Sequence, residues 1–280
     1  MNIIIPQKKN LEKIKAQIKK AGYQNLHILA DFDRTLTYGE FNGIKTPSLM
    51  SMLRDGNHLT EGYAAKAQAL FEKYHPMEVD PKIPLQQKKK VMREWWETHN
   101  ELLIKSGLSK SDLEDIVKNG HLKFREGVSE FLDFLKEHNI PLVIISASGC
   151  GDAIRMFFQK MGKDYSNIIY ITNKFNWDKN GKAISIKKPI IYVMNKDETI
   201  LEEIPEVYKI IKNRRNVLLL GDSLGDLGMI EGFKHDALIK IGFLNFDYDK
   251  DLAGFKKGFD VVLEGDGDFG YVNGLMKELG

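Results

Sequence analysis

The chain has 280 residues, 42% hydrophobic and 29% charged, a composition with enough apolar material for one large core or two domains and unlike that of a disordered chain. Its 41 basic and 39 acidic residues leave a net charge of +2, so no overall field favours a nucleic-acid polymer or an anionic membrane. The apolar patch at residues 3–5 is far too short for a signal peptide or a membrane span. The single cysteine, Cys150, cannot form an internal disulfide, which fits a reducing compartment. We expect a soluble, cytoplasmic protein with no obligate protein partner.

The predicted elements alternate between helices and buried strands over much of the chain. An amphipathic helix is predicted at residues 10–20, where apolar residues recur at helical spacing among lysines. Short apolar runs predict buried strands at 26–33, 141–148, 167–173, 216–223 and 237–244. Helical patterns at 127–139 and 151–162 flank the second strand, and a hairpin with its turn at Asn180 and Gly181 is predicted within 175–185. The alternation predicts an α/β fold with a doubly wound parallel sheet, a Rossmann-like core.

A long segment without strong strand patterns separates the first strand from the rest of this core. It contains helical patterns at 60–73, 86–105 and 109–119. We therefore predict a catalytic core formed by residues 1–40 and 124–280, with an inserted helical cap domain at 41–123. Such a cap could close over a site at the carboxyl ends of the strands and exclude water.

Two aspartates end the first predicted strand, in the sequence DFDRTLT (31–37). Alternation along a strand directs the side chains of Asp31 and Asp33 to the same side. One carboxylate could attack a phosphorus atom while the other protonates the leaving oxygen and then activates water. Two carboxylates would repel a phosphate dianion, so this chemistry needs cations nearby. A hard divalent metal with oxygen ligands and a lysine are the expected sources.

A second acidic pair, Asp222 and Asp226, follows the predicted strand at 216–223. Gly221 permits a tight turn there, and both carboxylates could face one cation. The alternative is helix capping, in which Ser223 caps a helix and Asp226 complements its dipole. Metal binding is favoured because the acidic ends of two strands in one sheet converge at its ligand crevice.

Ser146 closes a third strand and can donate a hydrogen bond to a phosphoryl oxygen, while nearby glycines let backbone amides approach the same group. Its alternative is another helix cap, for which Ser148 or Asp152 would serve as well. Lys187 and Lys188 follow the predicted hairpin and could offset phosphoryl charge, although a lysine pair is also common on a solvated surface.

These residues resemble the motifs of the haloacid dehalogenase superfamily, whose first motif is D-x-D-x-T after a hydrophobic strand. DFDRT has that form, Ser146 corresponds to the second motif, a lysine near 187 to the third, and GDSLGD (221–226) to the acidic fourth. Over nearly its full length the chain is similar to the pyrimidine 5'-nucleotidases. The similar stretches include YHPMEVDP, MREWWETHNELL, FREGVSEFLDFL, NIPLVIISAS and LIKIGFLN.

The resemblance implies that Asp31 is the nucleophile, that Asp33 is the acid and base, and that Ser146 and Lys187 bind the phosphate. It also implies Mg2+ bound by Asp31, by the backbone carbonyl of Asp33, and by Asp222 and Asp226. For the nucleotide's base it implies contact with Glu78, whose carboxylate can accept from the exocyclic amine of cytosine. Either Trp95 or Trp96 could supply a stacking face, because adjacent helical positions do not share a face.

Three features depart from the family pattern. SASGCGD (146–152) has one residue more than the usual S-A-G-x-G-D. The extra residue changes how the backbone amides around Ala147 are expected to contact the phosphate. A serine that helps bind the base is replaced by His99, with Thr98 one place away. Lys187 and Lys188 are adjacent, and the register with the downstream MNK favours Lys187.

The predicted function is Mg2+-dependent hydrolysis of a nucleoside 5'-monophosphate, CMP or UMP, through an aspartyl phosphate on Asp31. Alternatives are phosphate transfer to another hydroxyl, a different small phosphate ester such as 7-methyl-GMP or phosphoserine, and a non-catalytic nucleotide-binding protein. The last is disfavoured because none of the four motif positions carries an inert residue.

Overall fold

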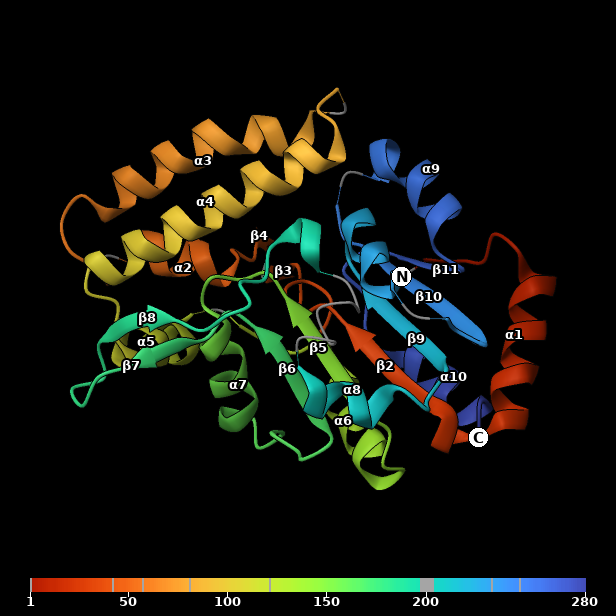
Figure 1. The fold of residues 1–280 in the computed structure, drawn as a ribbon. Coiled ribbons are helices and arrows are strands. Elements are labelled where there is room, and N and C mark those ends of the chain that lie inside the picture. Colours follow the sequence, from red (N-terminus) through yellow and green to blue (C-terminus); the bar gives the residue numbers. More distant parts are fainter. Residues whose placement is uncertain are drawn as a thin grey trace.

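A central sheet organises the computed structural model, which describes residues 2–41, 43–56, 58–80, 82–120, 122–196, 204–232, 234–246 and 248–280. Within them the sheet has seven strands in the order β1-β11-β10-β9-β2-β5-β6 (Figure 1). All neighbouring pairs are parallel except β1 with β11. The strands are β1 (Asn2–Ile4), β2 (Leu26–Ala30), β5 (Leu142–Ser146), β6 (Ile168–Thr172), β9 (Asn216–Gly221), β10 (Ala237–Leu244) and β11 (Val261–Glu264).

The five strands predicted from apolar runs are all present, and the predicted α/β fold with a doubly wound parallel sheet is confirmed. Most of their residues are buried, on both faces of the sheet, which is why the strands read as continuous apolar runs. The patch at residues 3–5 contributes to β1, a short antiparallel strand at the edge. Strand β1 and strand β11 had no sequence prediction.

Helices cover both faces of the sheet. One face packs against α1 (Lys8–Ala21), α6 (Val128–Glu137), α7 (Gly151–Lys160) and α10 (Gly270–Glu278). The other face packs against α8 (Pro205–Ile211), the 3-10 helix η4 (Leu224–Ile230) and α9 (Tyr248–Gly258). Alternation along β9 contributes to both cores, because Leu218 and Leu220 face the first layer whereas Val217 and Leu219 face the second.

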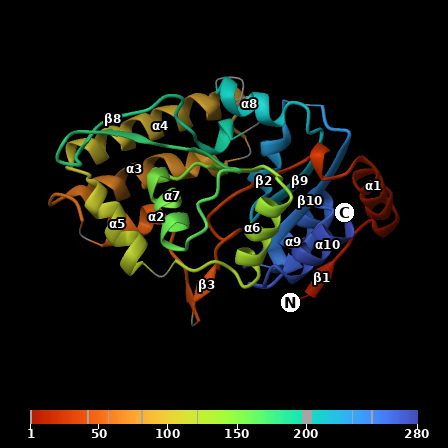
Figure 2. The ribbon, with the colours of Figure 1, turned by 90° about the horizontal axis from the view of Figure 1, so that it is seen from below.

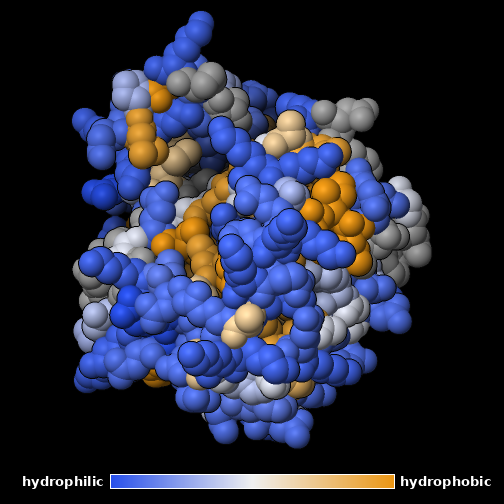
Figure 3. All heavy atoms as spheres, turned by 90° about the vertical axis from the view of Figure 1, so that its right-hand side faces the viewer, coloured by the Kyte–Doolittle hydropathy of each residue, from blue (hydrophilic) through white to orange (hydrophobic). Residues whose placement is uncertain are grey.

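Helix α1 illustrates how the outer layer is attached. Leu11 and Ile18 are buried against the sheet, as their helical spacing predicted, and lysines occupy the outward positions. Figure 3 shows the face of the molecule on this side, where hydrophilic atoms cover most of the surface and hydrophobic atoms show between them. The helix is therefore held by one apolar stripe.

The segment between β2 and β5 forms most of the remaining structure. It contains β3 (Glu40–Phe41), β4 (Ile44–Lys45), α2 (Leu49–Asp55), α3 (Tyr63–Val79), α4 (Leu85–Lys105) and α5 (Lys110–Asn119). Helices α3 and α4 lie side by side beyond the arrowheads of β2, β5 and β6 (Figure 1). Helix α5 packs on α7 beside the sheet, as the view from below also shows (Figure 2). The division into a core and a cap at 41–123 stays a prediction.

The hairpin predicted within 175–185 is present as β7 (Phe175–Trp177) and β8 (Ala183–Ile186). Gly181 has a φ of +76°, in the left-handed region that favours glycine, as the predicted turn requires. Strand β8 contacts α4, so the hairpin lies against the inserted segment. No helix in the described part of the chain is long and apolar enough to cross a membrane.

Candidate active site

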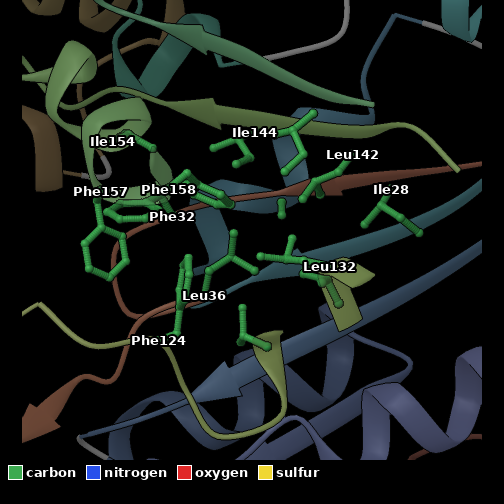
Figure 4. Packing of buried hydrophobic residues seen from close by; sticks show 14 of the residues in the cluster. Ile28, Phe32, Leu36, Phe124, Leu132, Leu142, Ile144, Ile154, Phe157 and Phe158 are labelled. Atoms are coloured by element: carbon green, nitrogen blue, oxygen red, sulfur yellow. The ribbon is translucent and has the colours of Figure 1, made fainter. Parts of the chain in front are cut away.

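The end of β2 carries the two aspartates of the first motif. The backbone N–H of Asp31 donates to the carbonyl of Leu220 at 3.0 Å, which extends the pairing with β9 by one residue. Phe32 points the opposite way, into the core, where it lies near Leu36, Phe124, Phe157 and Phe158 (Figure 4). Its ring contacts Phe157 edge-on, with centroids 5.9 Å apart. Burial of Phe32 thus directs Asp31 and Asp33 away from the core, as alternation predicted.

A lysine that the sequence analysis did not select reaches the first of these aspartates. The Lys196 ammonium donates to the carboxylate of Asp31 and, at 2.8 Å, to Oδ1 of Asp226. Lys196 is 7% exposed, so the ion pairs lie in a largely desolvated site. An ammonium there offsets carboxylate charge far more effectively than it would in water.

In the described part of the chain Lys196, and neither Lys187 nor Lys188, contacts the acidic cluster, while the role of an active-site lysine stays a prediction. Lys187 is exposed, and its backbone N–H donates to the carbonyl of Lys174. Lys188 is also exposed, and its ammonium lies 3.5 Å from a carboxylate oxygen of Glu97 on α4. Both follow the largely exposed strand β8, whereas Lys196 follows the apolar run at 190–193. That apolar run could have indicated Lys196 from the sequence, because a buried segment can bring the lysine that follows it to a buried carboxylate.

Asp226 uses its two oxygens for different purposes. Oδ2 accepts from the backbone N–H groups of Asp222 and Ser223 and from the Ser223 hydroxyl, each at 3.0 Å, completing a capping box at the start of η4. Oδ1 faces Lys196. A Cβ on Gly221 would lie 2.5 Å from the Asp226 Cβ, so a glycine is needed for this close approach. The capping alternative is therefore real for Asp226, and it coexists with a place in the acidic cluster.

The carboxylates of Asp31, Asp222 and Asp226 fit a divalent cation. They offer oxygen atoms that all lie within 4.8 Å of one another. Burial raises the pKa of Asp31 to about 7, against the lowering effect of Lys196, and repulsion from Asp226 and Asp33 adds to the rise. Burial also raises the pKa of Asp222 well above its usual value, with repulsion from Asp226 and Asp31. One ammonium does not neutralise this cluster, and hard oxygen ligands suit Mg2+.

A cavity of about 290 Å³ opens beside the acidic cluster. Asp33 lines it together with Ala147 and Ser148, which follow β5. Burial raises the pKa of Asp33 to about 6, against lowering by Arg34 and Lys196 and by a hydrogen bond from the Leu49 backbone. A carboxyl with that pKa is protonated in part near neutral pH, as a general acid must be.

Ser146 is buried at the end of β5, and its hydroxyl accepts from the backbone N–H of Ser148 at 3.2 Å. The Ser148 hydroxyl in turn accepts from the N–H of Cys150 at 3.3 Å, just before α7. The loop is tightly packed: a Cβ on Gly149 would lie 2.8 Å from Met50 Sδ and 3.0 Å from a ring carbon of Trp96. Ser146 and the turn at 147–149 thus join the β5 end to the cavity wall.

Aromatic rings from α3 and α4 form the opposite wall of the cavity. Trp95 and Trp96 both line it, and which of the two supplies a stacking face for a base stays a prediction. Their rings are 6.3 Å apart and 26° from parallel, so adjacent indoles lean over the same opening. The lining residues on this side are Tyr63, Phe71, Trp95, Trp96 and His99.

Glu78 is not among the residues that line the cavity. Its Oε2 lies 3.2 Å from His75 Nδ1, and its backbone carbonyl accepts from Lys88 at 2.7 Å. His75 stacks on Phe71, with centroids 4.6 Å apart, and Phe71 does line the cavity. Glu78 therefore reaches the lining residue Phe71 only through His75, one turn of α3 at a time.

His99 occupies the place where a family serine was expected. Its Nε2 lies 3.1 Å from the Tyr63 hydroxyl, and its ring stacks on Trp96 with centroids 6.0 Å apart. Burial lowers the pKa of His99 to about 4, with repulsion from Arg54 in the same direction. The imidazole is therefore neutral at physiological pH and offers a polar edge in an otherwise aromatic wall.

This lowered pKa predicts a pH-dependent stability. A histidine buried in its neutral form stabilises the fold fully above its unfolded pKa of about 6.5, and that stability is lost as the pH falls toward 4. Relative to a His99→Gln variant, the free energy of unfolding of the wild type should fall by about 1.4 kcal/mol per pH unit below 6.5. Urea unfolding at pH 7.5, 6.0 and 5.0 measures this difference, and a constant difference would contradict a buried neutral His99.

The fold and these strand ends together define a class of enzyme, the haloacid dehalogenase-like hydrolases. A substrate-bound phosphoserine phosphatase has the same fold, with a TM-score of 0.52, 18% identity, and 90% of this chain and 96% of that chain covered. Its sequence family and its relatives make the chain a phosphoric monoester hydrolase of this class.

The chain belongs to the pyrimidine 5'-nucleotidase (UMPH-1) family, whose sequence pattern matches residues 34–280. It is 33% identical over 262 residues to 7-methylguanosine phosphate-specific 5'-nucleotidase A of Xenopus laevis, covering 93% of this chain and 90% of that one. The crystal structure of cytosolic 5'-nucleotidase IIIB bound to cytidine is similar, with a TM-score of 0.88, 26% identity, and 99% and 93% coverage. The resemblance identified from the motifs is confirmed.

Proposed function

We propose that this protein hydrolyses pyrimidine nucleoside 5'-monophosphates, CMP or UMP, to nucleoside and phosphate with the help of Mg2+. The observation that carries the proposal is the placement of Asp31 and Asp33 at one strand end, between an acidic cluster and an aromatic-lined cavity. The cavity, about 290 Å³, has room for one base and sugar beside the carboxylates.

In this proposal the Asp31 carboxylate attacks the phosphorus atom and forms an aspartyl phosphate, while Asp33 protonates the departing 5'-oxygen of the nucleoside. Asp33 then takes a proton from the water that hydrolyses the aspartyl phosphate. Lys196 and Ser146 lie where they support phosphoryl oxygens, by charge and by hydrogen bonding. Mg2+ bound by Asp31, Asp222 and the Asp33 carbonyl, with Asp226 beside them, would supply positive charge that offsets repulsion between phosphate and carboxylates.

The base would stack on the indole wall formed by Trp95 and Trp96, with the neutral His99 edge available for hydrogen bonding. Glu78 contacts His75 and does not line the cavity, so its proposed contact with a cytosine amine requires its side chain to rearrange. We propose a cytoplasmic location, which the buried, unpaired Cys150 supports.

A second substrate, 7-methyl-GMP, is favoured by two specific observations. A 7-methylated guanine carries a positive charge, and cationic methylated groups are attracted to the faces of clustered aromatic rings. The wall described above supplies such faces, and relatives over 30% identical are named as 7-methylguanosine phosphate-specific. Arg54 at the cavity would oppose a cationic base, although its guanidinium is paired with Asp55 at 2.8 Å.

A substrate panel with and without metal tests the proposal. Phosphate release should be measured from CMP, UMP, GMP, 7-methyl-GMP and phosphoserine with Mg2+ and with excess EDTA. We expect CMP or UMP to exceed GMP and phosphoserine by at least about tenfold in kcat/KM, and EDTA to abolish release until Mg2+ is restored. A 7-methyl-GMP rate far above that of CMP would replace the first substrate by the second.

Two other outcomes of the panel would change the proposal more deeply. Release that survives EDTA would exclude the metal, and absence of release from every ester would favour a non-catalytic nucleotide-binding protein. Adding excess nucleoside as acceptor and analysing products by chromatography distinguishes hydrolysis from phosphate transfer, because an aspartyl phosphate can react with any hydroxyl that reaches it.

A further inference from the structure

Arg125 is the largest of the fully buried side chains, with 1% of its surface exposed, and the proposed chemistry does not use it. Its guanidinium lies between aromatic rings, 4.7 Å from the centroid of Phe243 and 5.6 Å from that of Tyr38. Nη1 donates to Oδ1 of Asp266 at 2.7 Å. In this ion pair the arginine side chain is fully buried, whereas the Asp266 side chain is partly exposed. Such a group is costly to bury and stays charged, so its contacts define its role.

The guanidinium holds the backbone that follows Asp33. Nε donates to the carbonyl of Thr35 at 2.9 Å, and Nη2 donates to the carbonyl of Arg34. Asn245, which follows β10, donates to the same Arg34 carbonyl at 2.9 Å and accepts from Arg125 at 2.7 Å. Both carbonyls of the turn are therefore fixed by side chains that come from outside it.

This turn has a backbone conformation that needs support. Arg34 has a φ of +59°, in the left-handed region that is unfavourable for a residue with a side chain. Non-glycine residues remain in such conformations where the surrounding structure fixes them, and they are frequent at active sites. Here the turn begins one residue after Asp33, so its geometry sets the direction in which the Asp33 carboxyl points.

The same pair also ties down both connections to the inserted helices. The outgoing chain is held where Asp266 accepts from the N–H groups of Gly39, at 2.8 Å, and Glu40, at 2.7 Å. The returning chain pairs with it where the N–H of Arg125 donates to the carbonyl of Leu36 at 3.0 Å. Arg125 and Asp266 thus join the Asp33 turn, both connections and the loop after β11.

We propose that Arg125 is a positioning residue, which fixes the Arg34–Thr35 turn and thereby places the Asp33 carboxyl on the leaving oxygen of the substrate. The proposal rests on the proposed role of Asp33 as general acid. Loss of Arg125 should therefore slow the hydrolysis of esters with poor leaving groups more than the hydrolysis of esters whose leaving group needs no proton. A general loss of stability would slow both to the same extent.

The test compares Arg125→Lys with wild type on a nucleotide and on p-nitrophenyl phosphate. Lysine keeps the charge beside Asp266 but cannot donate to both turn carbonyls and to Asn245 from one planar fork. We expect kcat/KM for the nucleotide, which reports the step in which the leaving group departs, to fall about 100-fold, because small displacements of a catalytic group have effects of this size. For p-nitrophenyl phosphate, whose leaving group is a weak base, kcat/KM should fall less than about tenfold. The values of kcat also include hydrolysis of the aspartyl phosphate, a step that the two substrates share.

Arg214→Lys is the matched control. Arg214 also donates to backbone carbonyls, those of Tyr23 and Leu26 at 3.0 Å and Asn139 at 3.1 Å, but it does so next to the amino ends of β2 and β9. We expect its loss to lower the melting temperature and to leave both kcat/KM values within about twofold. Equal losses of kcat/KM on the two substrates in Arg125→Lys, or kcat/KM unchanged for both, would overturn the proposal.

Hydrogen exchange gives a second readout that does not depend on activity. Amides of residues 34–37 should exchange at least about tenfold faster in Arg125→Lys than in wild type, and should be unchanged in Arg214→Lys. Asn245→Ala, which removes the other donor to the Arg34 carbonyl, replaces Arg125→Lys if the latter does not fold, and the same results are expected. If the wild type is inactive on every ester and the 34–37 amides exchange faster only in these variants, the assignment of the turn stands and the role of Asp33 is rejected. Unchanged exchange of the 34–37 amides in the variants rejects the assignment of the turn itself.

Discussion

Replacing Asp31 with Asn should reduce phosphate release from the best nucleotide substrate by at least about 10³-fold, because an amide cannot form the acyl phosphate that the mechanism requires. The change is nearly isosteric, and the amide oxygen still offers the Lys196 ammonium an acceptor. Phosphate release under single-turnover conditions measures the loss. Mass spectrometry of the purified variant excludes deamidation back to Asp.

A stability measurement shows whether the loss of activity in Asp31→Asn comes from the missing nucleophile or from unfolding. The pKa of Asp31 is raised to about 7 in the folded chain, so above that pH the ionised carboxylate lowers the free energy of unfolding. The amide in Asp31→Asn has no such charge, and we expect the variant to melt no lower than wild type at pH 8 in EDTA. Asp133→Asn, at an exposed carboxylate paired with Lys163 at 2.7 Å, is the matched control and should keep full activity. Wild-type turnover by Asp31→Asn would show that another group attacks phosphorus.

Replacing Lys196 with Met should lower kcat about 10² to 10³-fold, the range observed when one preorganised electrostatic contact at a developing charge is removed. The reason is that Lys196 is the buried cation bonded to both Asp31 and Asp226. Its loss leaves these carboxylates to repel each other and the phosphate. Steady-state kinetics at the Mg2+ concentration that just saturates the wild type measures the effect.

Lys187→Met is the paired control, since Lys187 precedes Lys196 in the same connection but is exposed, whereas Lys196 is buried. We expect its kcat to stay within about twofold of wild type. The reverse result, with Lys187 essential and Lys196 dispensable, would mean that the connection rearranges when substrate binds. Raising the Mg2+ concentration should rescue Lys196→Met in part if its main effect is on carboxylate repulsion.

Each strand that builds the site was predictable because its pattern is local. LHILA, LVIIS and NVLLLG are buried on both faces of the sheet, and a doubly covered parallel strand needs apolar residues at nearly every position. Alternation over three residues was enough to separate Phe32 from its two aspartates. The strands β1 and β11 are short, so their apolar runs carry less pattern.

The lysine was not predictable in the same way. Its partners Asp31 and Asp226 lie 165 and 30 residues away along the chain. Spacing and local pattern say nothing about which of several downstream lysines crosses that distance. The lining of the cavity was hard to predict for the same reason. Helical spacing puts Trp95 and Trp96 on different faces of α4, but both indoles line the cavity in the folded chain.

The sequence by itself determined the enzyme class of this protein, because an apolar strand ending in DFDRT and another ending in GDSLGD must bring carboxylates to one edge of a parallel sheet. Tertiary structure alone decided which cation meets Asp31, that Asp226 both caps a helix and faces that cation, and that Glu78 contacts His75 and does not line the cavity. Those outcomes depend on the burial of charge and on contacts between distant segments. Local residue patterns predict neither the burial of a charge nor a contact between distant segments.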